Sequence, residues 1–514
     1  MSARLDELAP DYDVIVIGGA LSGSATATLL LRKNPGIRIL IVDKSETFGR
    51  RVGEATVEVS GCFLGRVLGL TQYLNEAHIA KQGLRFWFAN DKVQSLDQAS
   101  EIGPRYLARL PSYQIDRAAL DEEVLRRAET AGATVLRPAM VSNIRLVDGG
   151  MQTLDVKQGG VKRGLSARWI VDASGIVAML ARKHGWWTPN TAHPTASAWS
   201  RWKGVKDWDG RGLAEKFPQW AAVQYGTRGT ATNHIIGDGW WSWWIPLKGG
   251  DVSVGVVFDQ RLVDFPQDGG NIGDRLKDFL MRHPVAREML EHARYVPEDL
   301  HFRKNLAYQS ERLAGDGFTL VGDAAAFIDP FYSPGMDWIS FTASRAADTI
   351  TRQRAGEEVR ALVEKHNRDL ALCISRWFDA LYRDKYHYIG EYDLMKLAFR
   401  LDLGLYYWGV VQAVFDDEEK GFLTAPFTHP AAGPIAALMR FYNHRFARIA
   451  ARRRRIGALG RMNDRQRLLI PGFTLHRGEI RKVVPLLWEW LKIELREGWR
   501  TWGSEPAPQP RETA

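Results

Sequence analysis

The sequence predicts an α/β fold with three parts: a Rossmann-like nucleotide-binding domain, a β-sheet substrate region and a helical carboxy-terminal cap. Three observations support this fold class. A glycine-rich turn joins an apolar strand to a helix near the start, two later apolar strands run into Asp172 and Asp323, and helical spacing of apolar residues begins at Ala343. The chain has 514 residues, too many for one simple core, so several modules are expected.

The first element is an apolar strand over residues 12–17, followed by a turn and a helix. Gly18 permits the tight turn, and Gly23 lets the helix pack close to the strand. The helix amino terminus then presents free N–H groups to a pyrophosphate. A second strand ends at Asp43, where a carboxylate can hold ribose hydroxyls. Ala20 replaces the middle glycine of the dinucleotide fingerprint, so the match is incomplete.

Three later segments point to the same kind of site. A helix follows Arg117, a strand runs into Asp172-Ala173-Ser174-Gly175, and another strand runs into Gly322-Asp323-Ala324-Ala325. In this order, the segments resemble the FAD-dependent enzymes of the aromatic-hydroxylase fold. The resemblance implies an FAD-binding domain in which Asp323 lies near the ribityl chain and the pyrophosphate. The expected FAD contacts are Gly18, Ala20, Gly23, Asp43, Glu54, Ala55, Arg117 and Asp323.

A tryptophan-rich strand over residues 240–246 carries the sequence WWSWWIP. Trp241 and Trp243 fall on the same face of a strand because side chains alternate with period two. With Ile245 and Pro246 they form W-x-W-x-I-P, which resembles the signature of flavin-dependent halogenases. The resemblance implies a wall that keeps the substrate away from the flavin ring. A cross-strand aromatic ladder in an ordinary sheet is the alternative interpretation.

Lys81 is the candidate catalytic residue. It follows the Gly53-Glu54-Ala55-Thr56 turn and a helix, in an order that resembles a halogenase segment, and "KQGLRF" is most similar to the phenol- and pyrrole-acting branch. The resemblance implies that FADH2, O2 and halide yield hypohalous acid, which a lysine between flavin and substrate directs to an electron-rich ring carbon. A single ammonium can donate a hydrogen bond to that acid or form a haloamine, and arginine has no comparable single nitrogen.

A candidate halide-binding site follows at "DPFYSPG", which resembles the Asp-Pro-x-x-Ser-x-Gly stretch of halogenases. The resemblance implies that halide binds beside Ser333, Pro334 and Gly335. Pro334 has no N–H, so one expected donor is missing, whereas the backbone of Gly335 can still approach an anion. Tyr332 stands where the tryptophan-acting branch has an acid, which again favours a phenol-like substrate.

The expected organisation is a discontinuous FAD-binding core with a sheet between its parts. The core spans residues 10–185 and 301–350, with an inserted substrate-region segment at 76–100; the substrate sheet spans 186–300, the helical domain 351–502 and a disordered tail 503–514. The basic cluster from Arg445 to Arg461 is expected to be a solvated helix face; a docking patch for an acidic partner is the alternative.

Composition excludes several other classes. Cys62 and Cys373 fit no metal or CxxC spacing, which favours the reducing cytoplasm and no metal centre. The amino terminus carries no apolar signal-peptide region, no stretch reads as a transmembrane segment, and no nucleic-acid motif accompanies the net charge of +9. Composition leaves monomer and homodimer open.

The sequence therefore predicts an FADH2- and O2-dependent halogenase that chlorinates or brominates a phenol- or pyrrole-like aromatic. No second nucleotide fingerprint is visible, so reduced FAD is expected from a separate flavin reductase. The small aromatic substrate is either free or tethered to a carrier protein. The alternative is an FAD-dependent monooxygenase or alkene reductase of the same fold. A catalytically degenerate flavoprotein is a third class, supported only by Ala20 and Pro334.

Overall fold

The predicted first strand lies at the centre of a parallel sheet in this computed structural model, which describes residues 3–224, 226–471, 481 and 483–502. β1 pairs in parallel with β2 and β10, and β7 and β20 extend the sheet on either side. The core half of β1 and all of β2 are buried, as expected of parallel strands covered on both faces. These strands are β1 (Asp11–Ile17), β2 (Ile39–Val42), β7 (Thr134–Leu136), β10 (Val161–Asp172) and β20 (Phe318–Leu320).

Helices α1 (Leu21–Lys33), α4 (Arg117–Thr130) and α10 (Gly335–Arg354) pack together beside this sheet. The helix expected from Ala343 thus begins at Gly335, because the proline and glycine at its start conceal the first two turns from pattern reading. The antiparallel strands that complete the eight-stranded sheet are β8 (Met140–Arg145), β9 (Gln152–Gln158) and β19 (Ala314–Gly315).

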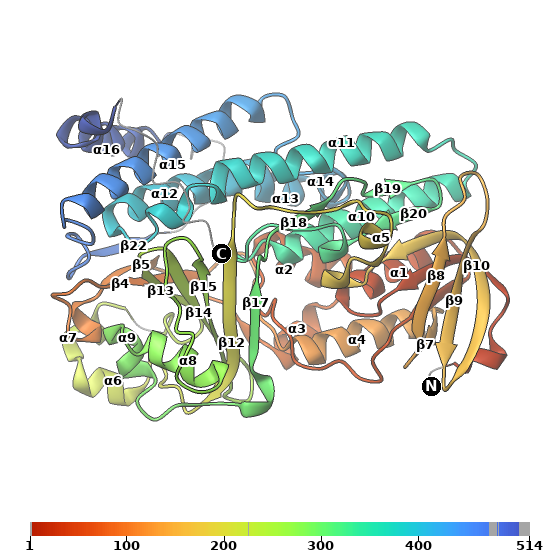
Figure 1. Ribbon diagram of the computed structural model, residues 1–514, viewed down its shortest axis with the longest axis horizontal. Helices are drawn as coiled ribbons and strands as arrows, with labels where there is room; N and C mark the ends of the chain where they lie inside the picture. Colours follow the sequence, from red (N-terminus) through yellow and green to blue (C-terminus); the bar gives the residue numbers. More distant parts are fainter. Residues whose placement is uncertain (1–2, 225, 472–480, 482, 503–514) are drawn as a thin grey trace.

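A second, nine-stranded sheet stands beside the first (Figure 1). Its strands come from distant parts of the chain: β4 pairs with β13, and β22 pairs with β5. The strands are β4 (Leu84–Phe88), β5 (Ser100–Pro104), β12 (Thr195–Lys203), β13 (Thr232–Gly237), β14 (Trp240–Pro246), β15 (Val252–Asp259), β16 (Arg294–Tyr295), β17 (His301–Lys304) and β22 (Arg467–Ile470).

The two faces of this sheet enter two hydrophobic cores. Trp241 and Trp243 pack into the large core that also contains β1 and β10. Trp244 packs on the opposite face, in a smaller core with α6, α8 and α9. The tryptophan strand β14 therefore separates the large core from the smaller core. The helices on the outer side are α6 (Arg211–Lys216), α7 (Pro218–Ala222), α8 (Ile272–Leu280) and α9 (Pro284–Met289).

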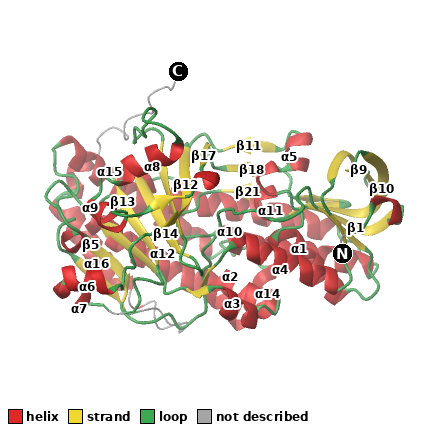
Figure 2. Ribbon diagram, turned by 90° about the horizontal axis from the view of Figure 1, so that it is seen from below, coloured by secondary structure: helices red, strands yellow, loops and turns green. Residues whose placement is uncertain are grey.

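The structure has two further small sheets, of two and three strands, and Figure 2 labels the strands of the three-stranded one. β3 (Ile79–Ala80) pairs with β6 (Tyr113–Gln114), and Gln114 also bridges to Ala55. This pairing fixes the segment that leads into Lys81. The other small sheet combines β11 (Trp187–Pro189), β18 (Tyr308–Ser310) and β21 (Ala326–Phe327). The short helices nearby are α2 (Glu58–Cys62), α3 (Thr71–Ala77) and α5 (Met179–Lys183).

The carboxy-terminal third forms a layer of helices along one side of both sheets (Figure 1). It also supplies β22, a strand that the helical pattern did not predict, because its partner β5 is far away in sequence. The predicted disordered tail lies outside the described residues. The helices are α11 (Arg360–Trp377), α12 (Tyr392–Tyr406), α13 (Gln412–Asp416), α14 (Glu418–Leu423), α15 (Ala432–Arg455) and α16 (Val483–Arg496).

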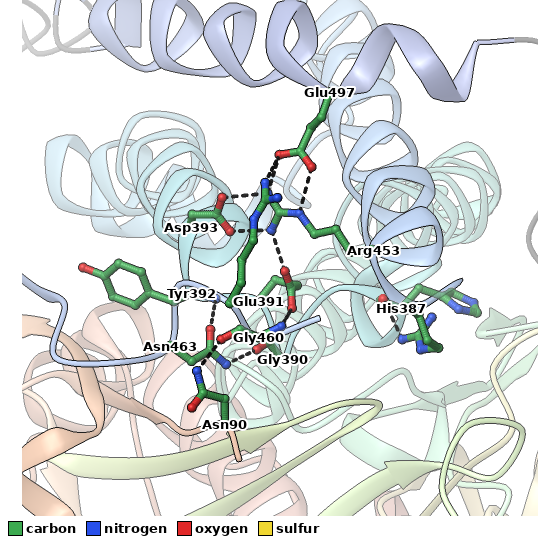
Figure 3. A network of polar contacts seen from close by, with 12 residues as sticks. Asn90, His387, Gly390, Glu391, Tyr392, Asp393, Arg453, Gly460, Asn463 and Glu497 are labelled. Carbon is green, nitrogen blue, oxygen red and sulfur yellow. Dashed lines mark hydrogen bonds and ion pairs between the residues drawn. The ribbon is translucent and has the colours of Figure 1, made fainter. Parts of the chain in front are cut away.

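The expectation of a solvated basic face on α15 is wrong for Arg445 and Arg453. Arg453 is fully buried and binds Asp393 at 2.7 Å and Glu497 at 2.7 Å, as Figure 3 shows. Arg445 is also buried and pairs with Glu494 at 2.8 Å. Helix spacing cannot reveal such pairs, since the acids come from α12 and from the region of α16. Across the ranges that the structure describes, no helix is both long enough and apolar enough to span a membrane.

Candidate active site

The glycine-rich turn after β1 leaves no room for side chains. Gly18 has φ +102°, and a Cβ on it would lie 2.4 Å from the carbonyl oxygen of Ala173. A Cβ on Gly23 would lie 1.9 Å from the carbonyl oxygen of Gly18. Neither glycine can change without a backbone shift, so strand, turn and helix meet here at the closest approach that backbones allow.

Asp43 lies at this turn, as its position after β2 predicts. Its carboxylate accepts hydrogen bonds from the N–H of Gly19 at 2.7 Å and of Ser45 at 2.8 Å. Ala20 is the N-cap residue of α1 and has no side-chain oxygen to cap the helix. Asp121 from α4 accepts from the N–H of Leu21 at 3.1 Å instead. Sequence reasoning missed Asp121, because nothing local relates α4 to the start of α1.

Arg117 connects the turn to Asp323. Its guanidinium pairs with Asp121 at 3.0 Å and lies 3.5 Å from the carbonyl oxygen of Gly53. Burial raises the pKa of Asp323 to about 6, and the positive charges of Arg117 and Arg303 oppose that rise. Asp323 is half-buried in the turn that follows β20, close enough to Arg117 for the guanidinium charge to act on its carboxyl group.

These residues fit the diphosphate and ribose parts of FAD. The turn at Gly18 and Gly23 exposes backbone N–H groups, and Asp43 offers a ribose acceptor. The Nε atom of Arg117 is buried without a hydrogen-bond partner among the described residues. A buried guanidinium nitrogen of this kind needs an acceptor, and a phosphate oxygen supplies one.

Glu54 and Ala55 lie on the far side of Arg117. Ala55 is buried and forms the backbone bridge to Gln114. The carboxylate of Glu54 accepts from Arg201 at 2.9 Å. Burial nevertheless raises the pKa of Glu54 to about 7, with Arg201 acting in the opposite direction. The side chain of Glu54 is thus already paired within the protein, so only the backbone of Glu54 is left for a cofactor.

Lys81 is buried, with only 2% of its surface exposed. Its backbone N–H donates to Ser112 at 2.8 Å, and its ammonium donates to the carbonyl oxygen of Thr56 at 2.6 Å. Burial lowers the pKa of Lys81 to about 8, while the negative charges of Glu58 and Asp337 oppose that shift. The ammonium therefore lies between the turn after Gly53 and the first residues of α10.

His234 is a buried neighbour of Lys81 that sequence reasoning missed. Burial lowers its pKa to about 3, and the positive charge of Lys81 adds to this effect. Its Nδ1 atom contacts the carbonyl oxygen of Ser242 at 3.2 Å, so this nitrogen carries the proton. Its Nε2 atom has no hydrogen-bond partner within the described parts of the chain. No local pattern in the sequence indicates this role, because His234 lies opposite Trp243 only once β13 and β14 pair.

The predicted wall residues occupy β14 as the period-two pattern requires. The indoles of Trp241 and Trp243 are 6.0 Å apart, and both side chains are buried on the same face. Ile245 is buried on that face too, and Pro246 ends the strand opposite Val252. The ring of Trp241 lies 5.3 Å from that of His234, which joins the wall to the surroundings of Lys81.

The predicted halide stretch is a strained loop that leads into α10. Tyr332 and Ser333 both have positive φ, at 71° and 59°, which is uncommon for residues with side chains. The N–H of Ser333 donates to Pro330 at 3.0 Å, and Pro334 caps the helix without an N–H. Gly335 starts α10, and the space beside its Cα is open. Gly335 is thus the backbone donor that remains for an anion.

The carboxylate of Asp329 connects this loop to neighbouring elements through hydrogen bonds. Its carboxylate accepts from the backbone N–H of Phe331 at 2.8 Å and contacts His193 Nε2 at 2.6 Å. It also accepts from the hydroxyl of Tyr386 at 3.0 Å, which in turn accepts from the indole N–H of Trp241 at 2.8 Å. Tyr386 therefore connects the tryptophan strand directly to the strained loop.

The carboxy-terminal helices hold the loop from the other side. Tyr382 donates to the carbonyl oxygen of Phe331 at 2.9 Å. Tyr332 donates to Asp402 at 3.0 Å, and Lys385 pairs with the same carboxylate at 2.7 Å. No local pattern indicates this role, because Tyr382 and Lys385 follow a helix for which the sequence predicts only a cap over the substrate region.

The comparisons with known proteins agree with this geometry. The family model described as tryptophan halogenase matches residues 13–95 and 89–389. The flavin-dependent halogenase chlA of Dictyostelium discoideum is 26% identical over 431 residues, which cover 77% of this chain and 69% of that protein. The 1H-pyrrole-2-carbonyl-[peptidyl-carrier protein] chlorinase of Pseudomonas fluorescens is 24% identical over 411 residues, covering 76% of this chain and 84% of that protein.

Solved structures share the fold. Halogenase PltM in complex with phloroglucinol and FAD superimposes with a TM-score of 0.71 at 18% identity, over 94% of this chain and 96% of that one. The flavin-dependent brominase Bmp2 reaches a TM-score of 0.61 at 22% identity, over 84% of this chain and 98% of that one. Because the family model matches well over half of the sequence, the chain belongs to the flavin-dependent halogenase family of enzymes.

Proposed function

We propose that this enzyme chlorinates or brominates an electron-rich aromatic ring, using reduced FAD, O2 and halide. The observation that carries the proposal is the burial of Lys81 beside the tryptophan strand and the start of α10. A solvated lysine could not keep an electrophilic oxidant away from water, whereas this ammonium is enclosed by protein atoms. The reaction type follows from family membership, and the lysine role and substrate class are proposed here.

Residues of the first domain would hold the cofactor. The turn at Gly18 and Gly23 would bind the pyrophosphate, Asp43 the ribose, and Arg117 with Asp323 the middle of the molecule. Reduced FAD bound there would give two electrons to O2, and the O2 activated in this way would take two more from halide, yielding hypohalous acid and water. Trp241 and Trp243 would separate the flavin side from the substrate side, because their indoles fill that face of β14.

Lys81 would direct the oxidant. At neutral pH its ammonium can donate one hydrogen bond to Thr56 and another to the oxygen of hypohalous acid. The ring carbon would then take the halogen, and the oxygen would leave as water with the ring proton. The N–H of Gly335 would hold the halide before oxidation, in the open space at the start of α10.

The substrate is proposed to be a phenol or a pyrrole, free or attached to a carrier protein. Tyr332 in the loop and the similarity to a chlorinase of a carrier-bound pyrrole and to a structure that binds phloroglucinol support this class. A separate flavin reductase would supply the reduced cofactor, because the motifs of the sequence account for one nucleotide site. The proposal leaves the choice between chloride and bromide to experiment.

The test is the Lys81→Ala variant, assayed with a flavin reductase, chloride or bromide, and a panel of phenols and pyrroles. Mass spectrometry should reveal halogen isotope patterns with the wild-type protein and none with the variant. Bound FAD should remain in the variant, since the residues proposed to hold the pyrophosphate and the ribose, Gly18, Gly23 and Asp43, are unchanged. Lys304→Ala is the matched control on the surface.

Two outcomes would contradict the proposal. Halogenated product from Lys81→Ala would remove the lysine from the mechanism. Hydroxylated or reduced products from the wild-type protein, formed equally without halide, would assign it to the monooxygenases or alkene reductases of the same fold.

A further inference from the structure

The outer face of α16 carries a row of apolar side chains that no described residue covers. Val484, Trp488, Leu491 and Leu495 recur at spacings of four, three and four residues. At about 100° per residue they fall within about 60° of one another on the helix surface. Trp499 and Trp502 continue the row through the 3₁₀ turn Gly498–Thr501. We call these six residues the apolar ridge.

The ridge is not the buried side of an ordinary amphipathic helix. Leu486 and Ile493 face the opposite direction and are buried against the body of the protein. The six ridge residues are instead 44–67% exposed, which places them among the most exposed large apolar side chains of the described residues. Three of the four tryptophans with exposed side chains in those residues belong to it. Such a concentration of apolar surface marks an interaction site rather than scatter.

Positive charges accompany the ridge. Lys492 lies over the ring of Trp488 at 5.7 Å, and Arg500 lies over the ring of Trp499 at 5.2 Å. Within the described part of the chain, neither cation forms a salt bridge with a carboxylate at 4.0 Å or less. The two cations are therefore free to meet negative charge on whatever covers the ridge.

The acids of the same helix are turned inward. Glu489 pairs with Arg400 at 2.6 Å, and Glu494 pairs with Arg445 at 2.8 Å. Both carboxylates are thus paired with arginines of α12 and α15, and Glu494 and Arg445 also contact Trp502 at the end of the ridge. The outer face is left apolar and positively charged, with no free carboxylate to attract the cations of a second copy.

From these observations, we infer that the ridge docks on an anionic lipid membrane. Indoles beside lysine and arginine suit the boundary between headgroups and acyl chains, where tryptophan lies half in each region and cations meet lipid phosphates. If two copies of the chain met ridge to ridge, Lys492 and Arg500 would face each other with no acid to compensate their charges. This repulsion disfavours a second copy as the partner. A fluid bilayer also accommodates a convex helix, whereas a protein partner would need a matching groove.

The experiment uses the full-length, FAD-loaded protein and sedimentation with large unilamellar vesicles. Phosphatidylcholine vesicles that contain one-third phosphatidylglycerol should bind the protein, and pure phosphatidylcholine should bind it far less. Binding should weaken as salt increases, because the headgroup contacts are ionic. The combined variant Trp488→Gln, Leu491→Gln and Leu495→Gln should bind at least about tenfold more weakly. The double variant Lys492→Gln and Arg500→Gln should lose the preference for phosphatidylglycerol.

The control carries Met140→Gln and Val161→Gln, two equally exposed apolar residues on strands of the other sheet. It should bind vesicles like the wild type. All variants should keep wild-type thermal midpoints and halogenate a soluble phenol normally, so failure here is separable from failure of the proposed function.

Three results would overturn the inference. These are no binding of the wild-type protein to anionic vesicles, binding that the ridge substitutions leave unchanged, and ridge-dependent association with something else. The third result could be a dimer seen by light scattering or binding of an acidic carrier protein. If the ridge substitutions abolish that association while vesicles remain unbound, the surface belongs to that partner.

Discussion

At the scale of single residues, burial decides what Lys81 can do. A lysine in water has a pKa near 10.4, and burial lowers that of Lys81 to about 8. One unit below this value, the ammonium form still outnumbers the neutral amine by about ten to one. Lys81 is therefore a hydrogen-bond donor at neutral pH, yet it loses its proton far more readily than a surface lysine.

The first prediction follows from this pKa. If the ammonium directs the oxidant, its protonated fraction falls as pH rises through about 8, and halogenation falls with it. The turnover rate at saturating substrate should show an alkaline limb near pH 8 rather than near 10. A rate that stays level up to about pH 9.5 would contradict the role of the ammonium. Peroxide released from reduced FAD and O2 should be measured in parallel, to separate Lys81 from effects on flavin oxidation.

The second prediction concerns Tyr386, a positioning residue between the tryptophan strand and the strained loop. Tyr386→Phe removes the hydroxyl that bridges Trp241 and Asp329. A hydrogen bond to a charged group contributes about 1.5–3 kcal/mol, so kcat/KM for halide should fall about tenfold or more, chiefly through KM. FAD affinity should be unchanged. Tyr106→Phe on the surface is the control, and a lower thermal midpoint with unchanged halide KM would reduce Tyr386 to a structural role.

Residues with local signals were predictable, and those with distant partners were not. Gly18, Gly23 and Asp43 could be found because strand, turn and helix are consecutive in sequence. Lys81 and the tryptophans were identified through resemblance, and their roles remain predictions. Tyr386 and His234 were missed because they act on residues that only the tertiary fold brings near. No spacing within the chain encodes such a contact.

At the scale of elements, the spacing of apolar residues predicts the buried face of β14 but not that of α15. Period two predicts that Trp241 and Trp243 share a face, and both enter the large core. Helical period cannot predict the inward side chain of Arg453 on α15, since it binds acids on α12 and after α16 (Figure 3). Hydrophobic patterning assumes that charged residues face water, and a buried ion network breaks that assumption.

The third prediction tests this network. Arg453→Met would leave Glu391, Asp393 and Glu497 in a buried cluster without their shared cation. Removing one partner of a buried ion pair costs about 3–5 kcal/mol of unfolding free energy, even though Glu497 keeps its pair with Arg461. Chemical denaturation should show the loss as a lower midpoint. Arg455→Met, on the exposed end of the same helix, should change the midpoint little. A variant at Arg453 as stable as the wild type would mean that the three acids take up protons or find other donors.

At the scale of the whole molecule, buried groups of two kinds give stability opposite dependences on pH. Burial raises the pKa of Asp337 to about 7, so the folded protein holds this proton after the unfolded chain has lost it. Burial lowers the pKa of His283 and His366 to about 3, so there the unfolded chain binds the proton first. Rising pH thus weakens the fold through Asp337 and strengthens it through the histidines.

The fourth prediction isolates the first of these effects. Asp337→Asn removes a carboxyl whose folded pKa is raised, so its stability relative to wild type should increase as pH rises from about 4 to about 7. The comparison cancels the histidines, which both proteins share. Thermal midpoints of the FAD-free proteins at about pH 5 and about pH 8 provide the measurement. Asp268→Asn on the surface should track wild type at both values, and equal behaviour of Asp337→Asn would show that Asp337 is ionised throughout.

The edge of the second sheet has a consequence for synthesis on the ribosome. Arg467 of β22 pairs with Glu101 of β5, 366 residues earlier in the chain. At about 5–20 residues per second, β5 emerges about 20–70 s before its partner exists. Through that interval the strand presents unpaired N–H and C=O groups to other nascent chains. Chaperone supply and growth temperature should therefore govern the soluble yield of this protein more strongly than the stability of its finished fold.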